Sequence, residues 1–469
     1  MRSDWSSGLD LLLELGRGHG LQASIEHSLR EAIRDGRLTP GTALPSSRSL
    51  SRDLGVARGT VSAAYSQLGA EGYLEVRQGA PIRVRWQPRH RPPAAHPATQ
   101  AARPRWDFRP GRPDSASFPR QAWARANRQV LSHAPDEIFG YGEPRGSTQL
   151  RQALSGYLGR ARGVDADPER LVICNGFTQA LTLICRTLRA AGVTSLAIED
   201  PSAPRYRQLA EAAGLTVVPI SCDQDGLQTD RLAASRARAA LVTPAHQYPL
   251  GVTMSAARRI ALVEWARHHH ATIIEDDYDG EFRYDRQPVA ALQHLDPDHV
   301  IYVGTASKTL APGLRLGWLS PPSALTATLS AAKDQLDRGS STLDQLTFAE
   351  LIATGAFDRH IRHMRTRYRR RRDALAQTLA SAHPAIRLEG ISAGLHAMIY
   401  LPEHEAAEQQ IQTRAERASI ALHTLGGYWH NPPQPRRQAI IIGYATPASH
   451  AYQPALRALT ELLMTLQWP

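Results

Sequence analysis

Lysine is nearly absent from this chain, which makes Lys308 the residue that most constrains its fold. The 55 basic residues include only two lysines, Lys308 and Lys333, and the others are arginines. A lysine amine can form an imine with an aldehyde, whereas an arginine side chain stays protonated and cannot. The apolar run 300–304 ends shortly before Lys308, which predicts a β-strand leading to the lysine. The simplest alternative is that Lys308 is a surface lysine at the end of a strand. Other segments of the chain must decide between this alternative and a reactive lysine.

A second apolar run, residues 271–274, leads into three carboxylates, Glu275, Asp276 and Asp277. Open α/β sheets build their sites in loops at the carboxyl ends of strands, so two such strands could aim Asp276 and Lys308 into one cleft. Pyridoxal phosphate (PLP) requires both groups, because an acid that keeps its pyridine nitrogen protonated makes the ring a better electron sink. By itself, the acidic run would fit a solvated turn equally well.

Three spaced segments together resemble the aminotransferase-like domain of MocR/GabR-type transcription regulators, which belong to the GntR superfamily. They are Ile-Glu-Asp-Asp-Tyr-Asp at 274–279, Ser-Lys-Thr-Leu-Ala-Pro-Gly-Leu-Arg at 307–315 and Tyr-Gly-Glu-Pro-Arg-Gly at 141–146. The resemblance runs from about Trp106 to about Tyr444. It implies an α/β PLP-dependent transferase domain (aminotransferase class I, fold type I) with a small carboxyl-terminal α+β subdomain, and PLP as the cofactor.

The same resemblance assigns roles to residues of this chain. Lys308 would bind the cofactor aldehyde, Asp276 would face the pyridine nitrogen and Tyr278 would hydrogen-bond the ring hydroxyl. Residues near the lysine and a glycine turn that opens a helix, a natural anion site, would hold the phosphate: Thr305, Ser307, Arg315, Gly176, Phe177 and Thr178. His246 and Gln247 would lie beside the ring. In isolation, the glycine turn would be an ordinary connection and His246 an ordinary structural histidine.

The amino-terminal residues predict a separate unit of three helices and a hairpin. Apolar positions recur at helical spacing within 21–35 and 58–71, a short helix fits 46–54, and residues 72–77 and 82–85 alternate like two strands. This order resembles the winged helix-turn-helix of GntR-type regulators, with 58–71 as the recognition helix in the major groove. The resemblance implies DNA contacts from Arg48, Arg58, Gly59, Thr60, Ser62, Arg77 and Gln78, with Arg83 as a further wing candidate.

Two positions depart from the GntR pattern. Ala57 stands where a Ser or Thr usually caps the recognition helix, and such a cap contributes about 1 kcal/mol to helix stability. The wing tip reads Gly79-Ala80-Pro81 where the family often has Gly-x-Gly.

Length and composition predict a multidomain chain. We expect a winged helix-turn-helix over residues 1–86, a proline-rich extended linker over 87–105 and the PLP-type domain over 106–469. The net charge of +11 suits a polyanionic partner such as DNA. Three cysteines without metal-ligand spacing predict no metal site and a reducing, cytoplasmic location, and no apolar stretch is long enough to span a membrane. The histidine run 268–270 and the arginine-rich run 365–372 are expected on solvated helix surfaces.

Two functions remain open at this point: a PLP-dependent transcription regulator that senses a small amine or amino acid, and a working aminotransferase that carries a DNA-binding domain. Two departures from aminotransferases favour sensing over catalysis. Ala203 replaces a residue that often stacks on the PLP ring, and Ile441 stands where aminotransferases commonly place a carboxylate-binding arginine. Arg205 is an alternative clamp for a ligand carboxylate. A homodimer is expected by resemblance, with each DNA-binding domain over the partner's PLP domain.

Overall fold

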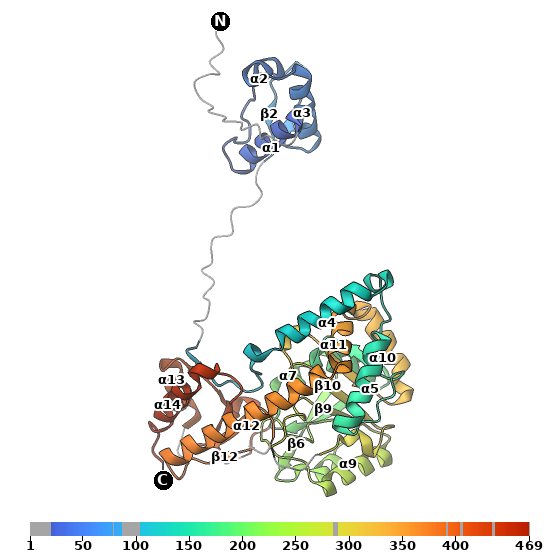
Figure 1. Ribbon diagram of the computed structural model, residues 1–469, viewed down its shortest axis with the longest axis vertical. Coiled ribbons are helices and arrows are strands. Elements are labelled where there is room, and N and C mark those ends of the chain that lie inside the picture. Colours follow the sequence, from blue (N-terminus) through green and yellow to red (C-terminus); the bar gives the residue numbers. More distant parts are fainter. Residues whose placement is uncertain are drawn as a thin grey trace. The chain divides into compact units, whose positions relative to one another are not determined.

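The structure is a computed structural model, and it describes residues 20–77, 79–86, 104–284, 289–390, 393–403, 407–433 and 437–468. The chain divides into two compact units, Met1–Arg103 and Pro104–Pro469 (Figure 1). Gln78 and most of the expected linker lie outside the described residues. Arg105 already belongs to the second unit, because its backbone N–H donates to Ser419 Oγ over 3.0 Å.

The first unit is a three-helix bundle with a short antiparallel hairpin, as the sequence predicts. Its elements are α1 (Leu21–Arg34), α2 (Ser47–Leu54), α3 (Arg58–Ala70), β1 (Leu74–Glu75) and β2 (Arg83–Val84).

The helix boundaries of the first unit follow from local chemistry. The Ser46 side chain accepts a hydrogen bond from the Ser49 N–H and so caps α2, which ends at Gly55 in the left-handed conformation. Ala57 offers no such cap to α3. A single apolar core joins the three helices to the hairpin, with Ile25, Val61 and Leu68 fully buried in it. This core gives the unit its own means of burying apolar surface.

The second unit contains an eight-stranded mixed sheet. Its strand order is β4 (Val172–Cys174), β11 (Gly317–Ser320), β10 (Val300–Thr305), β9 (Thr272–Asp277), β8 (Ala239–Val242), β5 (Ser195–Asp200), β6 (Thr216–Asp223) and β7 (Gly226–Leu227). Neighbouring strands from β10 through β6 are parallel, whereas β11 and β7 pair antiparallel with their neighbours.

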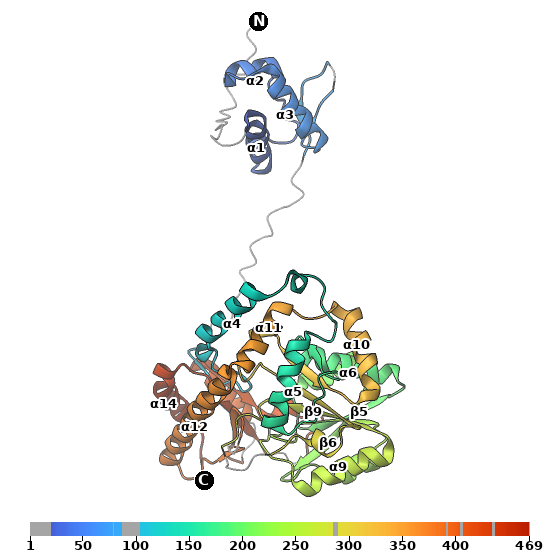
Figure 2. The same ribbon diagram turned by 45° about the vertical axis from the view of Figure 1, so that its right-hand side comes forward.

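Helices cover both faces of this sheet, because its central strands are apolar on both sides. In β8, Ala239 and Leu241 pack into one core cluster and Ala240 and Val242 into another. The helices are α4 (Arg120–His133), α5 (Thr148–Arg162), α6 (Phe177–Ala190), α7 (Pro204–Ala212), α8 (Thr229–Ala234), α9 (Ala256–His269), α10 (Ser323–Asp337), α11 (Thr342–Ala353) and α12 (Ala356–Ala382). Helices α4 and α11 run side by side in both views (Figures 1 and 2).

A smaller subdomain follows α12. Its antiparallel sheet has the order β12 (Leu388–Glu389), β13 (His396–Tyr400), β16 (Ala439–Gly443) and β15 (His423–Thr424), and α13 (Ala407–Arg417) and α14 (Tyr452–Leu463) pack with it. The first strand of the unit, β3 (Trp106–Asp107), pairs with β14 (Ile420–Ala421) of this subdomain. The single-turn helices are Ser115–Ser117, Asp136–Phe139, Leu292–Leu295, Pro312–Leu314, Leu425–Tyr428 and Ser449–Ala451.

The two predicted strands before Asp276 and Lys308 are neighbours in the sheet. They are β9 and β10, which pair in parallel with Val303 opposite Asp276. Parallel pairing brings their carboxyl ends to the same edge, so the acid and the lysine share one end of the sheet. None of the helices in the described ranges is both apolar enough and long enough to cross a bilayer.

The arginine-rich run 365–372 is not the solvated face that the sequence suggested. Arg371 is buried, and both Arg367 and Arg371 contact the buried carboxylate of Asp114. The expectation fails at these two positions because the subdomain and the 104–118 segment pack against this side of α12, which a helical pattern of charges cannot reveal. Arg369 and Arg370 of the same run are exposed, as expected.

Candidate functional site

A cavity of about 370 Å³ opens at the carboxyl edge of β9 and β10. It brings together eight of the eleven predicted cofactor residues and the predicted ligand clamp Arg205. Its lining consists of Pro110, Gly111, Phe177, Thr178, Ala203, Arg205, Tyr206, Tyr248, Asp276, Tyr278, Thr305, Ser307, Lys308, Pro312 and Arg315. Gly176, His246 and Gln247, also predicted, do not line the cavity and instead lie behind its wall.

Asp276 is the buried acid of this cavity. Its Oδ2 accepts a hydrogen bond of 2.6 Å from the Tyr206 hydroxyl, whereas its Oδ1 is buried with no partner in the described part of the chain. Burial raises the pKa of Asp276 to about 8, which the Tyr206 hydrogen bond only partly offsets. A carboxylate in this position is stabilised by a cationic N–H donor. A protonated pyridine nitrogen is such a donor, so the free oxygen fits the ring of PLP.

Lys308 extends into the same cavity from the turn after β10. Its Nζ donates a 2.6 Å hydrogen bond to the carbonyl oxygen of Gly111. Burial lowers the pKa of Lys308, while the nearby Asp276 and Asp279 raise it. A lowered pKa increases the fraction of neutral amine, which is the nucleophilic form. Lys308 therefore has the surroundings expected of a reactive lysine rather than of a surface one.

A set of hydroxyl, guanidinium and backbone groups at one end of the cavity suits a phosphate. Thr305 Oγ1 and Ser307 Oγ lie 2.9 Å apart, and Ser307 N–H donates to Thr305 Oγ1. Arg315, in the left-handed conformation, donates to the Asn175 carbonyl over 2.6 Å and lies against Gly176. A Cβ on Gly176 would approach that guanidinium to 3.3 Å, so glycine leaves room for it. Gly176 also begins α6, whose amino terminus attracts anions.

The second lysine has a structural role beside this phosphate-type end. Lys333 is fully buried and pairs with Asp337 at 2.5 Å. Asp337 in turn accepts hydrogen bonds from the amides of Asn175 and Gln179, at the start of α6. Lys333 therefore supports the glycine turn without reaching the cavity.

Tyr278 lines the cavity, and a network of hydrogen bonds holds its hydroxyl group in place. Its hydroxyl lies 3.0 Å from His246 Nδ1 and 3.0 Å from the His246 carbonyl oxygen. His246 Nδ1 is also 3.0 Å from Asp279 Oδ2. Gln247 bonds the backbone oxygens of Pro201 and Tyr248. His246 and Gln247 thus hold the wall that carries Tyr278.

One cluster of the described residues has metal-ligand chemistry, namely His246, Asp279 and His396. Each of these three residues already makes a hydrogen bond within the protein. His246 binds Asp279 and the Gly390 carbonyl, and His396 binds the Pro249 carbonyl at 3.1 Å. Burial lowers the pKa of His396 well below its usual value, which keeps that ring neutral. These contacts describe a buried hydrogen-bond network.

Three residues of the cavity make hydrogen bonds that the sequence did not predict. Tyr206 binds Asp276, Gly111 accepts from Lys308, and the Tyr248 hydroxyl lies 3.1 Å from that of Tyr428. Tyr206 directly follows Arg205, and Tyr248 directly follows Gln247, so proximity in sequence was an available signal for these two. Gly111 had none, because it lies 197 residues from Lys308.

The two departures from aminotransferases have different consequences in the fold. Ala203 lines the cavity and leaves space where a ring-stacking side chain was expected. Ile441 is fully buried in β16, in an apolar cluster with Met398 and Leu425. Arg205 lies on the cavity wall and is exposed. It can therefore present its guanidinium to a carboxylate.

The predicted DNA contacts of the first unit lie on solvent-facing positions. Arg58, Gly59 and Ser62 at the start of α3 are exposed, as is Arg48 on α2, while Thr60 is half-buried. On the wing, Arg77 is exposed and pairs with Glu75 at 2.5 Å. Arg83 instead donates to the Gly41 carbonyl over 2.8 Å, which braces the hairpin.

Comparison with known proteins agrees with this division of the chain. The family description "Aminotransferase class I and II" matches residues 111–426, and "Bacterial regulatory proteins, gntR family" matches residues 21–84. The structure of an archaeal alanine:glyoxylate aminotransferase superposes with a TM-score of 0.70 at 25% identity, covering 77% of this chain and 91% of that one.

Curated relatives extend over both units. The HTH-type transcriptional regulator YdeL of Bacillus subtilis is 34% identical over 89% of this chain and 91% of its own length. The pyridoxine biosynthesis transcriptional regulator PdxR of Corynebacterium glutamicum is 32% identical over 87% of this chain and 89% of its own length. The probable rhizopine catabolism regulatory protein MocR of Rhizobium meliloti is 30% identical over 97% of this chain and 96% of its own length.

Fold and cavity therefore define a fold type I aminotransferase domain joined to a GntR-type DNA-binding domain. Aminotransferases of this class depend on PLP in general. The chain belongs to the HTH-type transcriptional regulators with an aminotransferase-like domain, the group that includes MocR and PdxR, and it is a transcription regulator.

Proposed function

We propose that this regulator binds PLP covalently through Lys308 and senses a small amine or amino acid in the Lys308 cavity. The observation that carries the proposal is the buried Oδ1 of Asp276, which lacks a partner in the described residues, in the same cavity as Lys308. PLP supplies an aldehyde that the lysine amine can bind and that an incoming amine can take over by exchange.

Residues of this chain have separate tasks in the proposed site. Asp276 holds a proton on the pyridine nitrogen, and Tyr206 orients Asp276. Thr178, Ser307 and Arg315 bind the phosphate, and Tyr278 donates to the ring hydroxyl. Each of these side chains lines the cavity, so one bound cofactor can reach all of them.

We infer sensing rather than efficient turnover from the effector side of the cavity. Ile441 is enclosed in an apolar cluster and offers no cation there. Arg205 is the residue we assign to an effector carboxylate, since it is a guanidinium on the cavity wall. The names of two relatives concern pyridoxine biosynthesis and rhizopine catabolism in those organisms, and both describe regulators of small-molecule metabolism.

The test of the site is chemical trapping of the lysine. The purified protein is incubated with PLP and reduced with borohydride, and its peptides are analysed by mass spectrometry. The cofactor mass should appear on the peptide that contains Lys308 and not on the one that contains Lys333, which is buried in an ion pair. A label on Lys333 alone, or an unchanged absorbance spectrum in Lys308→Ala, would remove the basis of the proposal. If the protein instead catalysed transamination over many turnovers, the alternative function as an aminotransferase would be favoured.

A further inference from the structure

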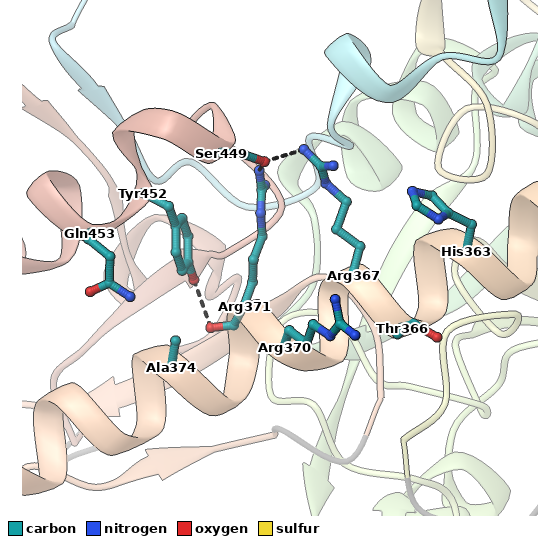
Figure 3. A pocket seen from close by; sticks show the side chains of 9 residues that line it. All are labelled: His363, Thr366, Arg367, Arg370, Arg371, Ala374, Ser449, Tyr452 and Gln453. Atoms are coloured by element: carbon teal, nitrogen blue, oxygen red, sulfur yellow. Dashed lines mark hydrogen bonds between the residues drawn. The ribbon is translucent and has the colours of Figure 1, made fainter.

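A second cavity, of about 490 Å³, lies between α12 and the segment that begins α14 (Figure 3). Its cationic wall comes from successive turns of α12, which carry Arg367, Arg370 and Arg371. The opposite wall consists of Ser449, Tyr452 and Gln453. None of the residues that line it also lines the Lys308 cavity. It is therefore a separate feature of the second unit.

Internal contacts fix two of the three guanidinium groups. Arg371 donates to the Ala445 carbonyl and, over 3.1 Å, to Ser449 Oγ, and its guanidinium lies over the Tyr452 ring. Arg367 also donates to Ser449 Oγ, and a dashed line marks this contact in Figure 3. Because the protein itself holds these groups in place, a ligand would lose little conformational entropy in meeting them.

The positive charge of this cavity is only partly balanced. Asp114 Oδ2 lies 2.8 Å from Arg367 and 3.2 Å from Arg371, and among the residues that the structure describes it is the single carboxylate that pairs with these three arginines. Arg370 has no ion-pair or hydrogen-bond partner within the described ranges of the chain. Three guanidinium groups against one carboxylate leave about two positive charges, which matches the charge of roughly −1.5 to −2 on a phosphate monoester near neutral pH.

One buried donor of the set is also unsatisfied. Arg367 Nε is buried and has no hydrogen-bond partner among the described residues. Burial lowers the pKa of Arg371, and the neighbouring charge of Arg367 lowers it further, against the raising effect of Asp114. A bound oxyanion would offset the repulsion between the guanidinium groups and accept hydrogen bonds from those of their N–H groups that face the cavity.

We propose that this cavity binds a small phosphate monoester, whose oxygens accept from Arg367 and Arg370 and whose organic part occupies the space beside Ala374 and Gln453. The recessed position favours a small molecule over DNA. Only 6% of the Arg371 side chain and 29% of the Arg367 side chain are exposed, whereas backbone phosphates of a duplex need cations that stand out from the surface. The proposal does not depend on whether Lys308 binds PLP.

The experiment is calorimetric titration of the full-length protein with methyl phosphate. It is run on protein loaded with PLP and then freed of excess PLP, which is itself a phosphate monoester, and separately on Arg315→Gln, so that the phosphate-type end of the Lys308 cavity cannot account for the signal. The double variant Arg367→Gln/Arg370→Gln should weaken binding at least about tenfold, which corresponds to about 1.4 kcal/mol. The matched control Arg362→Gln/Arg369→Gln removes the same charge from exposed positions of the same helix and should change affinity by less than about threefold.

If the double variant fails to fold, the single variant Arg370→Gln still tests the proposal. Arg370 is exposed, so Arg370→Gln should fold and still weaken methyl phosphate binding by about threefold or more. Equal losses in the double variant and its control would show a general charge effect and overturn the proposal. The absence of any methyl phosphate binding would also overturn the proposal. Methyl phosphate binding that only the Arg315→Gln substitution abolishes would overturn it as well. A double variant that loses affinity for a mixed-sequence duplex but keeps that for methyl phosphate would assign the surface to DNA instead.

Discussion

Asp276 is a carboxyl group in surroundings that do not favour its charge. The fold buries it at the end of β9, gives it one hydrogen bond from Tyr206 and leaves its other oxygen without a partner among the described residues. A buried carboxyl group in such a setting shifts towards its protonated form. A structural carboxylate would have no reason to keep this arrangement, whereas a partner for a ring nitrogen requires it. Two predictions follow from this residue.

The first concerns pH and stability in the cofactor-free protein. The pKa of Asp276 is about 8 in the folded chain, against an ordinary value of 3.8. Between these values the folded chain retains a proton that the unfolded chain has released, so this group's contribution to stability is lost as pH rises from about 4 to about 8. From about pH 5 to about pH 8, wild type should therefore lose more unfolding free energy than Asp276→Asn, by roughly 1–3 kcal/mol.

Urea denaturation at the two pH values measures this difference. Asp298→Asn, at an exposed position, serves as the control and should keep the wild-type pH dependence. Identical pH dependence in wild type and Asp276→Asn would mean that the carboxyl group is ionised in the folded protein throughout this range.

The second prediction concerns Tyr206. Its hydroxyl is the hydrogen-bond donor to Asp276 that the structure shows, at 2.6 Å. Tyr206→Phe should weaken PLP binding by roughly tenfold, since a hydrogen bond to a charged group contributes about 1.5–3 kcal/mol. Fluorescence titration with PLP measures the dissociation constant. Tyr284→Phe, which removes a hydroxyl bonded to the Gly394 carbonyl, should leave it near wild type, and a similar loss in both variants would count against a specific role for Tyr206.

Among the elements, α3 combines exposed polar residues with an uncapped amino terminus. Ala57 precedes the helix without a side-chain cap, although Ser46 and Ser147 provide one to α2 and α5. A helix whose first N–H groups lack partners is less stable there and free to bind phosphate oxygens. The start of α3 is therefore less stable than a capped helix end, but its backbone N–H groups remain available as hydrogen-bond donors.

Replacement of Ala57 by serine tests this local stability. Ala57→Ser should stabilise the start of α3 by about 1 kcal/mol and slow amide hydrogen exchange in its first turns by roughly fivefold. Ala63→Ser places the same residue inside α3, where serine is a poorer helix former than alanine, so exchange should not slow. Faster exchange in Ala57→Ser would show that the backbone at this position cannot support a cap.

We also propose that α3 is the element that recognises the operator DNA. Arg58 is exposed at the first position of α3, and Arg58→Ala should lower operator affinity by about 1–3 kcal/mol if it makes a bidentate contact with a base. Operator binding, measured by fluorescence anisotropy, should weaken steeply with increasing salt concentration in both wild type and Arg58→Ala. Arg37→Ala, at an exposed position outside α3, should have a smaller effect. A fragment starting at Trp106 that still binds the operator would refute the assignment.

At the scale of the whole molecule, the chain consists of two units with separate cores. The first carries the DNA-binding module and the second the Lys308 cavity. We propose that the protein acts as a homodimer, because GntR-type modules generally read two half-sites. A ligand can change DNA binding only if it binds two conformations of the protein with different affinity. We propose that exchange of an amine effector at Lys308 supplies that difference.

The prediction at this scale is a response to effector that depends on Lys308. An amine effector should change operator affinity in the PLP-loaded wild-type protein and leave that of Lys308→Ala unchanged. Anisotropy measured with labelled operator and a series of amines detects the change, and light scattering reports the oligomeric state. Monomers at micromolar concentration, or the same response in Lys308→Ala, would contradict the mechanism.

Local patterns in the sequence were enough to predict much of this protein. The period of apolar residues predicted α1, α3, β9 and β10, and the short motifs predicted that Asp276 and Lys308 share a cavity, because parallel strands end at one edge of a sheet. Both family resemblances were confirmed. These features depend on spacing along the chain, which the sequence states directly.

Tertiary structure alone decided the contacts between distant segments. The Gly111 carbonyl meets Lys308, Tyr206 meets Asp276 across 70 residues, and Asp114 draws Arg367 and Arg371 into a buried cluster that the charge pattern of α12 suggested was solvated. Such contacts depend on how helices and the subdomain pack around the sheet. Burial, and with it the pKa of Asp276, follows from that packing, so it cannot be inferred from a residue and its neighbours in sequence.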